Sequence, residues 1–141
     1  MSAPAIHRVV VEGLARLPQF CHCTVADGWI HVSGTLGTKP GELALVEGGM
    51  ARQTTQTMTN IGHILEAVGA TFDDLVKVSV FVDDMAHFGE MNAAYEAFFD
   101  GVTPPARITV GRAGLALGAA VEIEAIAYKP GAAPRSDRGA S

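Results

Sequence analysis

The first third of the chain alternates apolar and polar residues with a period of two, which is typical of strands. Residues 7–13 (HRVVVEG) predict a short strand. Residues 24–34 (TVADGWIHVSG) predict a hairpin turn at Asp27 and Gly28, followed by a second strand. A loop rich in glycine, proline and threonine ends this part of the pattern.

From Met50 the apolar residues recur every three or four positions, which is the period of a helix. The spacing places these residues on one helical face: Met50, Met58, Ile61, Leu65 and Val68. Gly69 follows directly and suits a C-terminal cap. The segment therefore predicts an amphipathic helix that ends near Gly69.

Residues 73–84 (DDLVKVSVFVDD) give the clearest strand pattern. The alternation places four valines on one face: Val76, Val78, Val80 and Val82. It places four other residues on the opposite face: Leu75, Lys77, Ser79 and Phe81. The valine face is expected to pack in the core.

Asp84 can cap a second helix, and the prolines of GVTPPA end it. Its expected core stripe has steps of three and four residues: Phe88, Met91, Tyr95 and Phe98. Two last strands are predicted at residues 107–111 (RITVG) and 120–128 (AVEIEAIAY).

The order β-β-α-β-α-β-β predicts an α+β fold, a mixed sheet with two helices on one face. We expect one domain over residues 1–128 and a disordered tail over residues 129–141. The outward positions of the last strand join Leu75, Ser79 and Phe81 in a surface that is half polar and half apolar: Glu122, Glu124, Ile126 and Tyr128. That mixture fits a subunit interface containing a polar pocket better than a plain solvated face.

The composition excludes several classes of function. The 141 residues are 48% hydrophobic and 18% charged, with a net charge of −5 and no cluster of Lys or Arg. This balance argues against binding to nucleic acid or to an anionic membrane. No apolar run is long enough to span a bilayer, and MSAPAIHR lacks the pattern of a signal peptide. A cytoplasmic protein is expected.

Arg107 and Glu122 are the first candidates for chemistry. If the last two strands form an antiparallel hairpin, Arg107 falls near Glu122 across the ladder. One interpretation is a structural ion pair on a surface, worth roughly 0–1 kcal/mol. The other is an arginine fork for a small carboxylate, with a glutamate beside it to handle a water.

Four segments, in order, resemble the Rid (YjgF) family of enamine/imine deaminases: HVSGTL, the long segment from RQTTQ to EAFF, PPAR and VEIEAIA. The likeness runs from about Phe20 to Tyr128. It implies a chorismate-mutase-like fold, assembled as a homotrimer with sites in the clefts between subunits. It also implies a hydrolase of the 2-iminobutanoate/2-iminopropanoate deaminase type that needs no metal or organic cofactor. The reaction would convert 2-aminoacrylate-type enamines and imines to 2-keto acids and ammonia.

The resemblance also implies roles for particular residues. Arg107 matches an arginine that would grip the substrate carboxylate, and Glu122 matches a glutamate that would hold or activate the attacking water. Ser33, Gly34 and Asn92 match residues that line the substrate pocket. An imine carbon is already electrophilic, so a positioned water and a fixed carboxylate suffice for hydrolysis.

Departures from the family pattern cluster before the HVSG segment. Active deaminases usually carry PYSQA there, and Phe20 takes the place of the tyrosine and lacks its hydroxyl. Thr109 stands where a cysteine is common. Both positions are expected to line the substrate site and to affect its specificity.

The segment QFCHCT contains the only two cysteines of the chain, Cys21 and Cys23. A zinc site would need two more ligands, and the other histidines show no paired metal spacing. The spacing also differs from the C-x-x-C of redox proteins. We therefore expect thiols that pack as apolar residues at a reshaped pocket edge, with Cys21 and His22 as possible additional pocket residues. In an extended segment the two thiols would point the same way and His22 the other, where it is either structural or an extra acid/base group.

Two alternatives to a deaminase remain open. The first is a non-catalytic or regulatory protein of the same fold that binds a small carboxylate, which Phe20 favours. The second is nucleic-acid processing, because related proteins have been labelled endoribonucleases or translation inhibitors. The acidic balance speaks against the second alternative.

Overall fold

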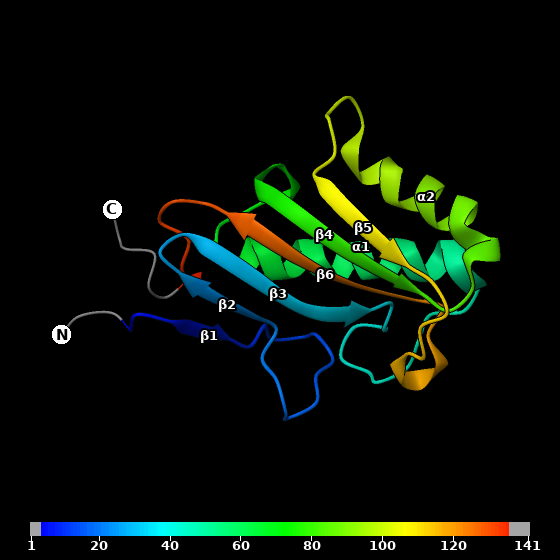
Figure 1. Cartoon of the computed structure of the whole chain (residues 1–141). Coiled ribbons are helices and arrows are strands. Elements are labelled where there is room, and N and C mark those ends of the chain that lie inside the picture. The colour runs from blue at the N-terminus through cyan, green and yellow to red at the C-terminus, as the bar shows by residue number, and fades with distance from the viewer. Residues whose placement is uncertain (1–3, 136–141) are drawn as a thin grey trace.

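Six strands form one mixed sheet in the computed structural model, which describes residues 4–135 (Figure 1). The spatial order is β1-β2-β3-β6-β4-β5, and β4 and β5 are the parallel pair. The strands are β1 (His7–Val9), β2 (Cys23–Ala26), β3 (Trp29–Leu36), β4 (Leu75–Val82), β5 (Ala106–Val110) and β6 (Val121–Tyr128). The α+β fold class predicted from the sequence is therefore confirmed.

The hairpin between β2 and β3 turns where the sequence predicts it. Asp27 and Gly28 both have positive φ angles, 49° and 85°, and Ala26 pairs with Trp29 across the turn. Two successive positive φ values match the twist of the strands in a tight hairpin, and glycine adopts such angles without strain. β2 itself is missing from the predicted strand order, because its four residues are too few to show a clear alternation; it pairs with β1 and β3.

Two helices lie on one side of the sheet, α1 (Gly49–Ala67) and α2 (Phe88–Glu96). α1 packs on β3 and β6 and against α2. The predicted apolar face of α1 is buried, and Gly69 follows its end with a φ of 87°. A short helical turn before α2 is capped by Asp84, whose Oδ1 accepts a hydrogen bond from the Ala86 N–H at 2.9 Å. The two predicted helices are thus confirmed, with Met91 and Tyr95 in the core.

The start of β4 departs from the predicted alternation. The pairing with β6 shifts between Leu75 and Lys77, as at a β-bulge, and an extra residue there reverses the facing of side chains before it. Leu75 consequently packs against the core and Val76 is 42% exposed, the reverse of the prediction. Val78, Val80 and Val82 are buried as expected.

The last two strands do not form a hairpin. β6 is inserted between β3 and β4, and β5 pairs only with β4, at the edge of the sheet. The connection passes the end of β4, where the Ala113 N–H donates to the Val82 carbonyl and the Asp83 N–H donates to the Ala120 carbonyl. The predicted antiparallel pairing of residues 107–111 with 120–128 is therefore wrong.

Residues after β6 continue along the domain. The Lys129 N–H donates to the Gly28 carbonyl, and the Ala133 N–H donates to the Val68 carbonyl, with Ala133 buried. The remainder of the tail that the sequence predicts to be disordered, residues 136–141, lies outside the described residues. Within the part of the chain that is described, neither helix has the length and apolarity needed to cross a membrane.

Candidate functional site

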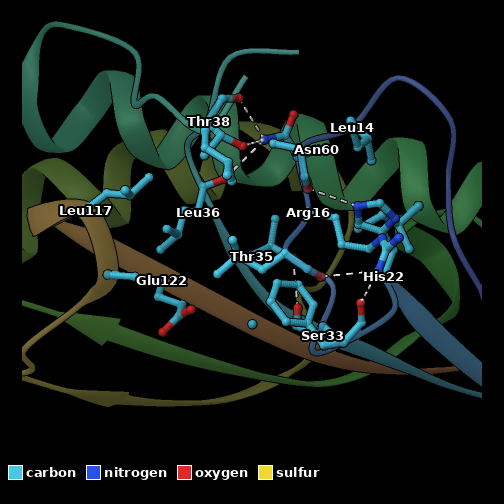
Figure 2. Close-up of a pocket in the computed structure, with 17 residues that line it drawn as sticks. Leu14, Arg16, His22, Ser33, Thr35, Leu36, Thr38, Asn60, Leu117 and Glu122 are labelled. Atoms are coloured by element: carbon cyan, nitrogen blue, oxygen red, sulfur yellow. Dashed lines mark hydrogen bonds between the residues drawn. The ribbon is translucent and has the colours of Figure 1, made fainter. Parts of the chain in front are cut away.

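A cavity of about 420 Å³ opens beside the second half of β3. Its walls come from the loop between β1 and β2, the loop after β3, helix α1, and the turn and first residues of β6 (Figure 2). Six large aliphatic side chains line it: Leu14, Leu17, Leu36, Leu43, Ile64 and Leu117. We call this space the Glu122 cavity, because the Glu122 carboxylate is the acidic group that lines it.

Glu122 lies near the start of β6, paired with Leu36 of β3 and Phe81 of β4. It faces away from the helices, since Val121 and Ile123 on either side are buried in the core. Burial raises the pKa of the Glu122 carboxyl above its usual value, and the nearby Glu124 charge raises it further. A carboxyl group with a raised pKa exchanges protons more readily near neutral pH, as general acid/base chemistry requires.

Ser33 and Gly34 lie at an irregularity in β3, where the pairing with β6 shifts between Val32 and Thr35. Ser33 Oγ donates to the Cys21 carbonyl at 2.6 Å, and the Ser33 N–H donates to the His22 carbonyl at 3.0 Å. Both residues line the Glu122 cavity. Ser33 therefore fixes the segment before β2 against the mouth of the site.

His22 is a structural residue of the cavity wall. Its Nδ1 accepts a hydrogen bond from the Val11 N–H at 2.8 Å, and its Nε2 lies 3.1 Å from the Ala15 carbonyl oxygen. A carbonyl only accepts, so Nε2 carries the proton and donates to Ala15. Both ring nitrogens are engaged and the side chain is 5% exposed, which leaves no nitrogen for the additional acid/base role that the sequence left open.

Phe20 also lines the Glu122 cavity, with 41% of the residue exposed. Its carbonyl accepts a hydrogen bond at 2.9 Å from Arg16, which also donates to the Leu17 carbonyl at 3.2 Å. Arg16 thus holds the loop that carries Phe20. The aromatic ring gives this edge of the site an apolar surface without a hydroxyl.

The two cysteines are free thiols. Cys23 is fully buried in β2, and burial together with the nearby Cys21 raises its pKa to about 12. Cys21 Sγ donates to the Cys23 carbonyl at 3.4 Å and does not line the Glu122 cavity. The chain bends at His22, and His22 and Cys23 are both buried. Within residues 4–135, no three His, Cys, Asp or Glu side chains are grouped to hold a metal ion.

Arg107 lies apart from the cavity, on β5. Its guanidinium carbon is 4.9 Å from the centre of the Tyr95 ring and 5.8 Å from that of Phe88, both within the range of cation–π contacts. Nη1 makes a weak contact with Met91 Sδ at 3.8 Å. No carboxylate in the described part of the chain lies within ion-pair distance of this guanidinium, so its charge is held in place but not neutralised.

Polar groups without partners lie on the same elements as Arg107. The Thr109 hydroxyl is buried on β5, two residues further along, and the Tyr95 hydroxyl is buried on α2. Neither has a hydrogen-bond partner among residues 4–135. Burial raises the pKa of Tyr95, against the opposing effect of the Arg107 charge. Asn92 lies on α2 next to Met91 and is half-buried.

The structure therefore divides the site residues expected from the sequence into two groups. Phe20, His22, Ser33, Gly34 and Glu122 surround the cavity, whereas Arg107, Thr109 and Asn92 lie on β5 and α2. Arg107 pairs with Val78, which faces the helices, and Glu122 pairs with Phe81 on the other face. Within one chain the two candidate catalytic side chains lie on opposite faces of the sheet, with β4 between their strands.

Sequence reasoning missed Asn60, which lines the cavity from α1. Its Nδ2 donates to the Leu36 and Thr38 carbonyls, each at 3.1 Å, and its Oδ1 accepts from Gln56 at 2.9 Å. An asparagine one residue before Ile61, beside the apolar stripe of the helix, was the available signal. It fastens the end of β3 and the following loop to the helix.

The sequence of the chain is similar to those of known proteins. The family described as Endoribonuclease L-PSP matches residues 12–129. The 2-iminobutanoate/2-iminopropanoate deaminase of Rattus norvegicus is 38% identical over 115 residues, which cover 82% of this chain and 83% of the rat protein.

Solved structures agree with the sequence comparison. The YjgF gene product of E. coli is similar with a TM-score of 0.78 and 34% identity, over 86% of this chain and 96% of that chain. E. coli TdcF with bound serine is similar with a TM-score of 0.79 and 25% identity, over 86% of this chain and 97% of that chain. The chain belongs to the endoribonuclease L-PSP family, which is also the YjgF or Rid family.

Proposed function

We propose that this protein is an enamine/imine deaminase that hydrolyses 2-aminoacrylate-type intermediates to 2-keto acids and ammonia. The observation that carries the proposal is the Glu122 carboxyl group, which is half-buried at the wall of a cavity and whose pKa is raised. No group among residues 4–135 donates a hydrogen bond to its side chain. The similarity of the whole chain to proteins named 2-iminobutanoate/2-iminopropanoate deaminase supplies the substrate class.

The chemistry that we assign to Glu122 is proton transfer around one imine carbon. The carboxylate accepts a proton from a water as the water oxygen bonds to the carbon of the protonated imine, whose nitrogen becomes a neutral amine. The carboxyl group then gives that proton to the amine. As the carbon–nitrogen bond breaks, the carboxylate takes the proton of the new hydroxyl group, and the keto acid and ammonia leave, the ammonia then taking up this last proton. A raised pKa suits a group that must both accept and return a proton.

Arg107 is assigned to the substrate carboxylate, which its planar guanidinium can hold through two hydrogen bonds. In one chain Arg107 and Glu122 lie on opposite faces of the sheet, so both can reach one substrate only if they come from different subunits. Two exposed apolar residues on β5, Ile108 and Val110, support a subunit contact at this edge. We therefore propose shared sites in a homotrimer, with no metal or organic cofactor in the reaction.

A binding protein for small carboxylates is the second candidate, and Phe20 favours it. The phenylalanine leaves this edge of the cavity without the hydroxyl that a tyrosine would offer to a substrate or a water. The bound serine in TdcF supports a site for a small amino-acid-like ligand in this fold, for either function. The net charge of −5 continues to oppose a nucleic-acid substrate.

The test generates the imine in the presence of the protein. A pyridoxal-phosphate dehydratase or an amino-acid oxidase supplies the intermediate, and release of keto acid and ammonia is followed with and without the protein. We expect Arg107→Ala to lower kcat/KM on the order of 100-fold, because the carboxylate of the bound substrate would lose its charged partner. Glu122→Gln should lower it by about 100-fold or more, because the proton acceptor is lost.

Two matched variants serve as controls. Glu124→Gln removes a carboxylate two residues along the same face of β6, and Arg112→Ala removes an exposed arginine near β5. Both should keep turnover within a few-fold of the wild type. Wild-type protein that leaves the release of keto acid unchanged would contradict the proposal. Binding of a small carboxylate without release of ammonia would then support the second candidate.

A further inference from the structure

We propose that the Glu122 cavity receives the side chain of the substrate, and that this side chain is bulky and apolar, branched aliphatic or aromatic. The inference rests on the proposed deaminase function and adds the substrate class. It predicts that imines related to leucine or phenylalanine are better substrates than the three-carbon imine related to alanine.

The size of the cavity is the first argument. Its volume of about 420 Å³ lies within the range of roughly 300–1,000 Å³ that is typical of small-molecule sites. A three-carbon imino acid adds only a methyl group to its carboxylate and imine, and would leave most of this space empty. The cavity extends away from Glu122, as Figure 2 shows, with Glu122 and Leu117 toward one end and Leu14 and His22 toward the other.

The state of the polar groups in the wall is the second argument. Hydrogen bonds within the chain already engage Ser33 Oγ, Asn60 Nδ2 and both nitrogens of His22. Thr35 Oγ1 donates to the Ser33 carbonyl at 2.8 Å. These groups gain little from a polar ligand atom, whereas Phe20 and the five leucines of the wall lose water-exposed apolar area when a ligand covers them.

The charges in the wall do not favour an acidic side chain, because the positive charge of Arg16 is offset by the Glu122 carboxylate. Of the described residues that line the cavity, Arg16 carries the formal positive charge, and its Nη1 donates to the Leu17 and Phe20 carbonyls. Glu122 lines the same space and would repel a second carboxylate. Imines related to aspartate or glutamate should therefore be poor substrates.

The wall is fastened on both sides before any ligand arrives. His22 ties the β1–β2 loop to the start of β2 through Val11 and Ala15, and Asn60 ties the loop after β3 to α1. A cavity held open in this way binds an apolar group without first ordering its own loops, which lowers the cost of binding.

The substrate class also indicates its source. A leucine- or phenylalanine-type imine has no leaving group on its β-carbon, so elimination from an amino acid cannot produce it. It forms when an oxidant, such as the flavin of an amino-acid oxidase, takes two electrons and two protons from the amino acid. The proposed cavity thus fits the product of amino-acid oxidation better than the product of a dehydratase.

The experiment compares a homologous series of imines. An amino-acid oxidase generates the imines of alanine, 2-aminobutyrate, leucine, phenylalanine and glutamate, and kcat/KM is measured for keto-acid release, with catalase present to remove peroxide. We expect kcat/KM to rise by about 10-fold per added methylene, up to the leucine-derived imine. Leucine- and phenylalanine-derived imines that are hydrolysed no faster than the alanine-derived imine would overturn the inference while the deaminase function stands.

A variant that fills the Glu122 cavity, with a matched control, tests whether the preference for longer imines arises in this cavity. Leu14→Trp fills part of the cavity, whereas Val10→Trp adds the same side chain at a neighbouring exposed position outside it. Leu14→Trp should lower the ratio of kcat/KM for the leucine-derived over the alanine-derived imine by about 10-fold or more. Val10→Trp should leave that ratio unchanged, and an equal effect of both variants would contradict the proposed location.

A binding measurement separates this inference from the proposed function. If the wild type accelerates the hydrolysis of none of the imines, the deaminase proposal fails. Titration calorimetry then compares pyruvate with 4-methyl-2-oxopentanoate, the keto acid of the leucine series. Binding of the longer keto acid at least about 10-fold more tightly would support an apolar subsite. Equal affinity, or no binding of either keto acid, would overturn it.

Discussion

Gly34 decides where the Glu122 carboxylate lies. A Cβ at position 34 would lie 2.9 Å from Glu122 Oε2, closer than real Cβ contacts come, and 3.2 Å from its Cδ, which is a tight contact. The missing side chain therefore lets the carboxylate rest against the backbone of β3, where it is half-buried. This close approach explains physically why a glycine follows Ser33 at the edge of the cavity.

The raised pKa of Glu122 has a consequence for stability. The ordinary value is 4.5, and the folded state binds the proton more tightly than the unfolded state does. The favourable contribution of the Glu122 carboxyl group to the free energy of unfolding is complete below its unfolded-state pKa. This contribution is lost as the pH rises through its folded-state pKa. We expect the wild type to lose free energy of unfolding relative to Glu122→Gln as the pH rises above 4.5, the ordinary pKa of the carboxyl group.

Urea denaturation of both proteins at several pH values measures this difference. Glu124→Gln removes the smaller cause of the shift and should leave most of the effect in place. A wild type that gains stability relative to Glu122→Gln as the pH rises would show that the folded protein favours the charged carboxylate.

Individual residues were only partly predictable from the sequence. The apolar character of Phe20 and the burial of Cys23 follow from residue type, and both were expected. The environment of His22 was not, because its partners Val11 and Ala15 are seven or more residues away and belong to an irregular loop. Only the folded chain brings these backbone groups to the imidazole ring.

At the scale of elements, the helices were predictable and the strand partners were not. The periods of α1 and α2 and the caps near them are local features, so the sequence alone locates them. The partner of a strand depends on the whole sheet, and β6 pairs with β3 and β4 rather than with β5, its neighbour in sequence. The bulge that exposes Val76 likewise depends on the pairing of β4 with β6.

Two threonines on the buried face of α1 allow a paired test of hydrogen bonding. Thr54 and Thr57 are both fully buried, but Thr57 Oγ1 donates to the Gln53 carbonyl at 2.7 Å, whereas Thr54 Oγ1 has no partner among residues 4–135. We expect Thr54→Val to raise the free energy of unfolding by about 1 kcal/mol, because an unsatisfied hydroxyl is removed. Thr57→Val should lower it by about 1 kcal/mol.

Urea denaturation again provides the measurement, with the similar helix propensities of Thr and Val cancelling between the two variants. The opposite signs are the important result. Equal destabilisation by both variants would mean that the Thr54 hydroxyl has a hydrogen-bond partner in solution.

At the scale of the whole molecule, the separation of Arg107 from Glu122 is the main finding. The sequence predicts the two residues side by side across a hairpin, whereas the observed strand pairing places them on opposite faces of the sheet in one chain. The homotrimer with shared sites that we propose is consistent with this separation.

Mixed oligomers test the shared site directly. Arg107→Ala and Glu122→Gln chains are unfolded together, refolded as a mixture and assayed against each variant refolded alone. We expect the mixture to regain activity at roughly a quarter of the shared sites, by random assortment around a closed ring. Recovery requires that one subunit supplies the arginine and its neighbour the glutamate.

Chains mixed without unfolding serve as the control, because intact oligomers that exchange slowly should remain inactive. A mixture that stays as inactive as its components, although its oligomers contain both chains, would place both residues in one subunit's site. The same result would remove the argument for a trimer based on the opposite faces.

The opposite placement of these two side chains also links catalysis to protein concentration. If neighbouring subunits supply the two halves of each site, a dissociated chain carries two incomplete halves and turns over nothing. Specific activity would then fall on dilution, with a midpoint set by the subunit dissociation constant rather than by KM. In a cell, the activity of such a protein would rise more steeply than in proportion to the concentration of its chains.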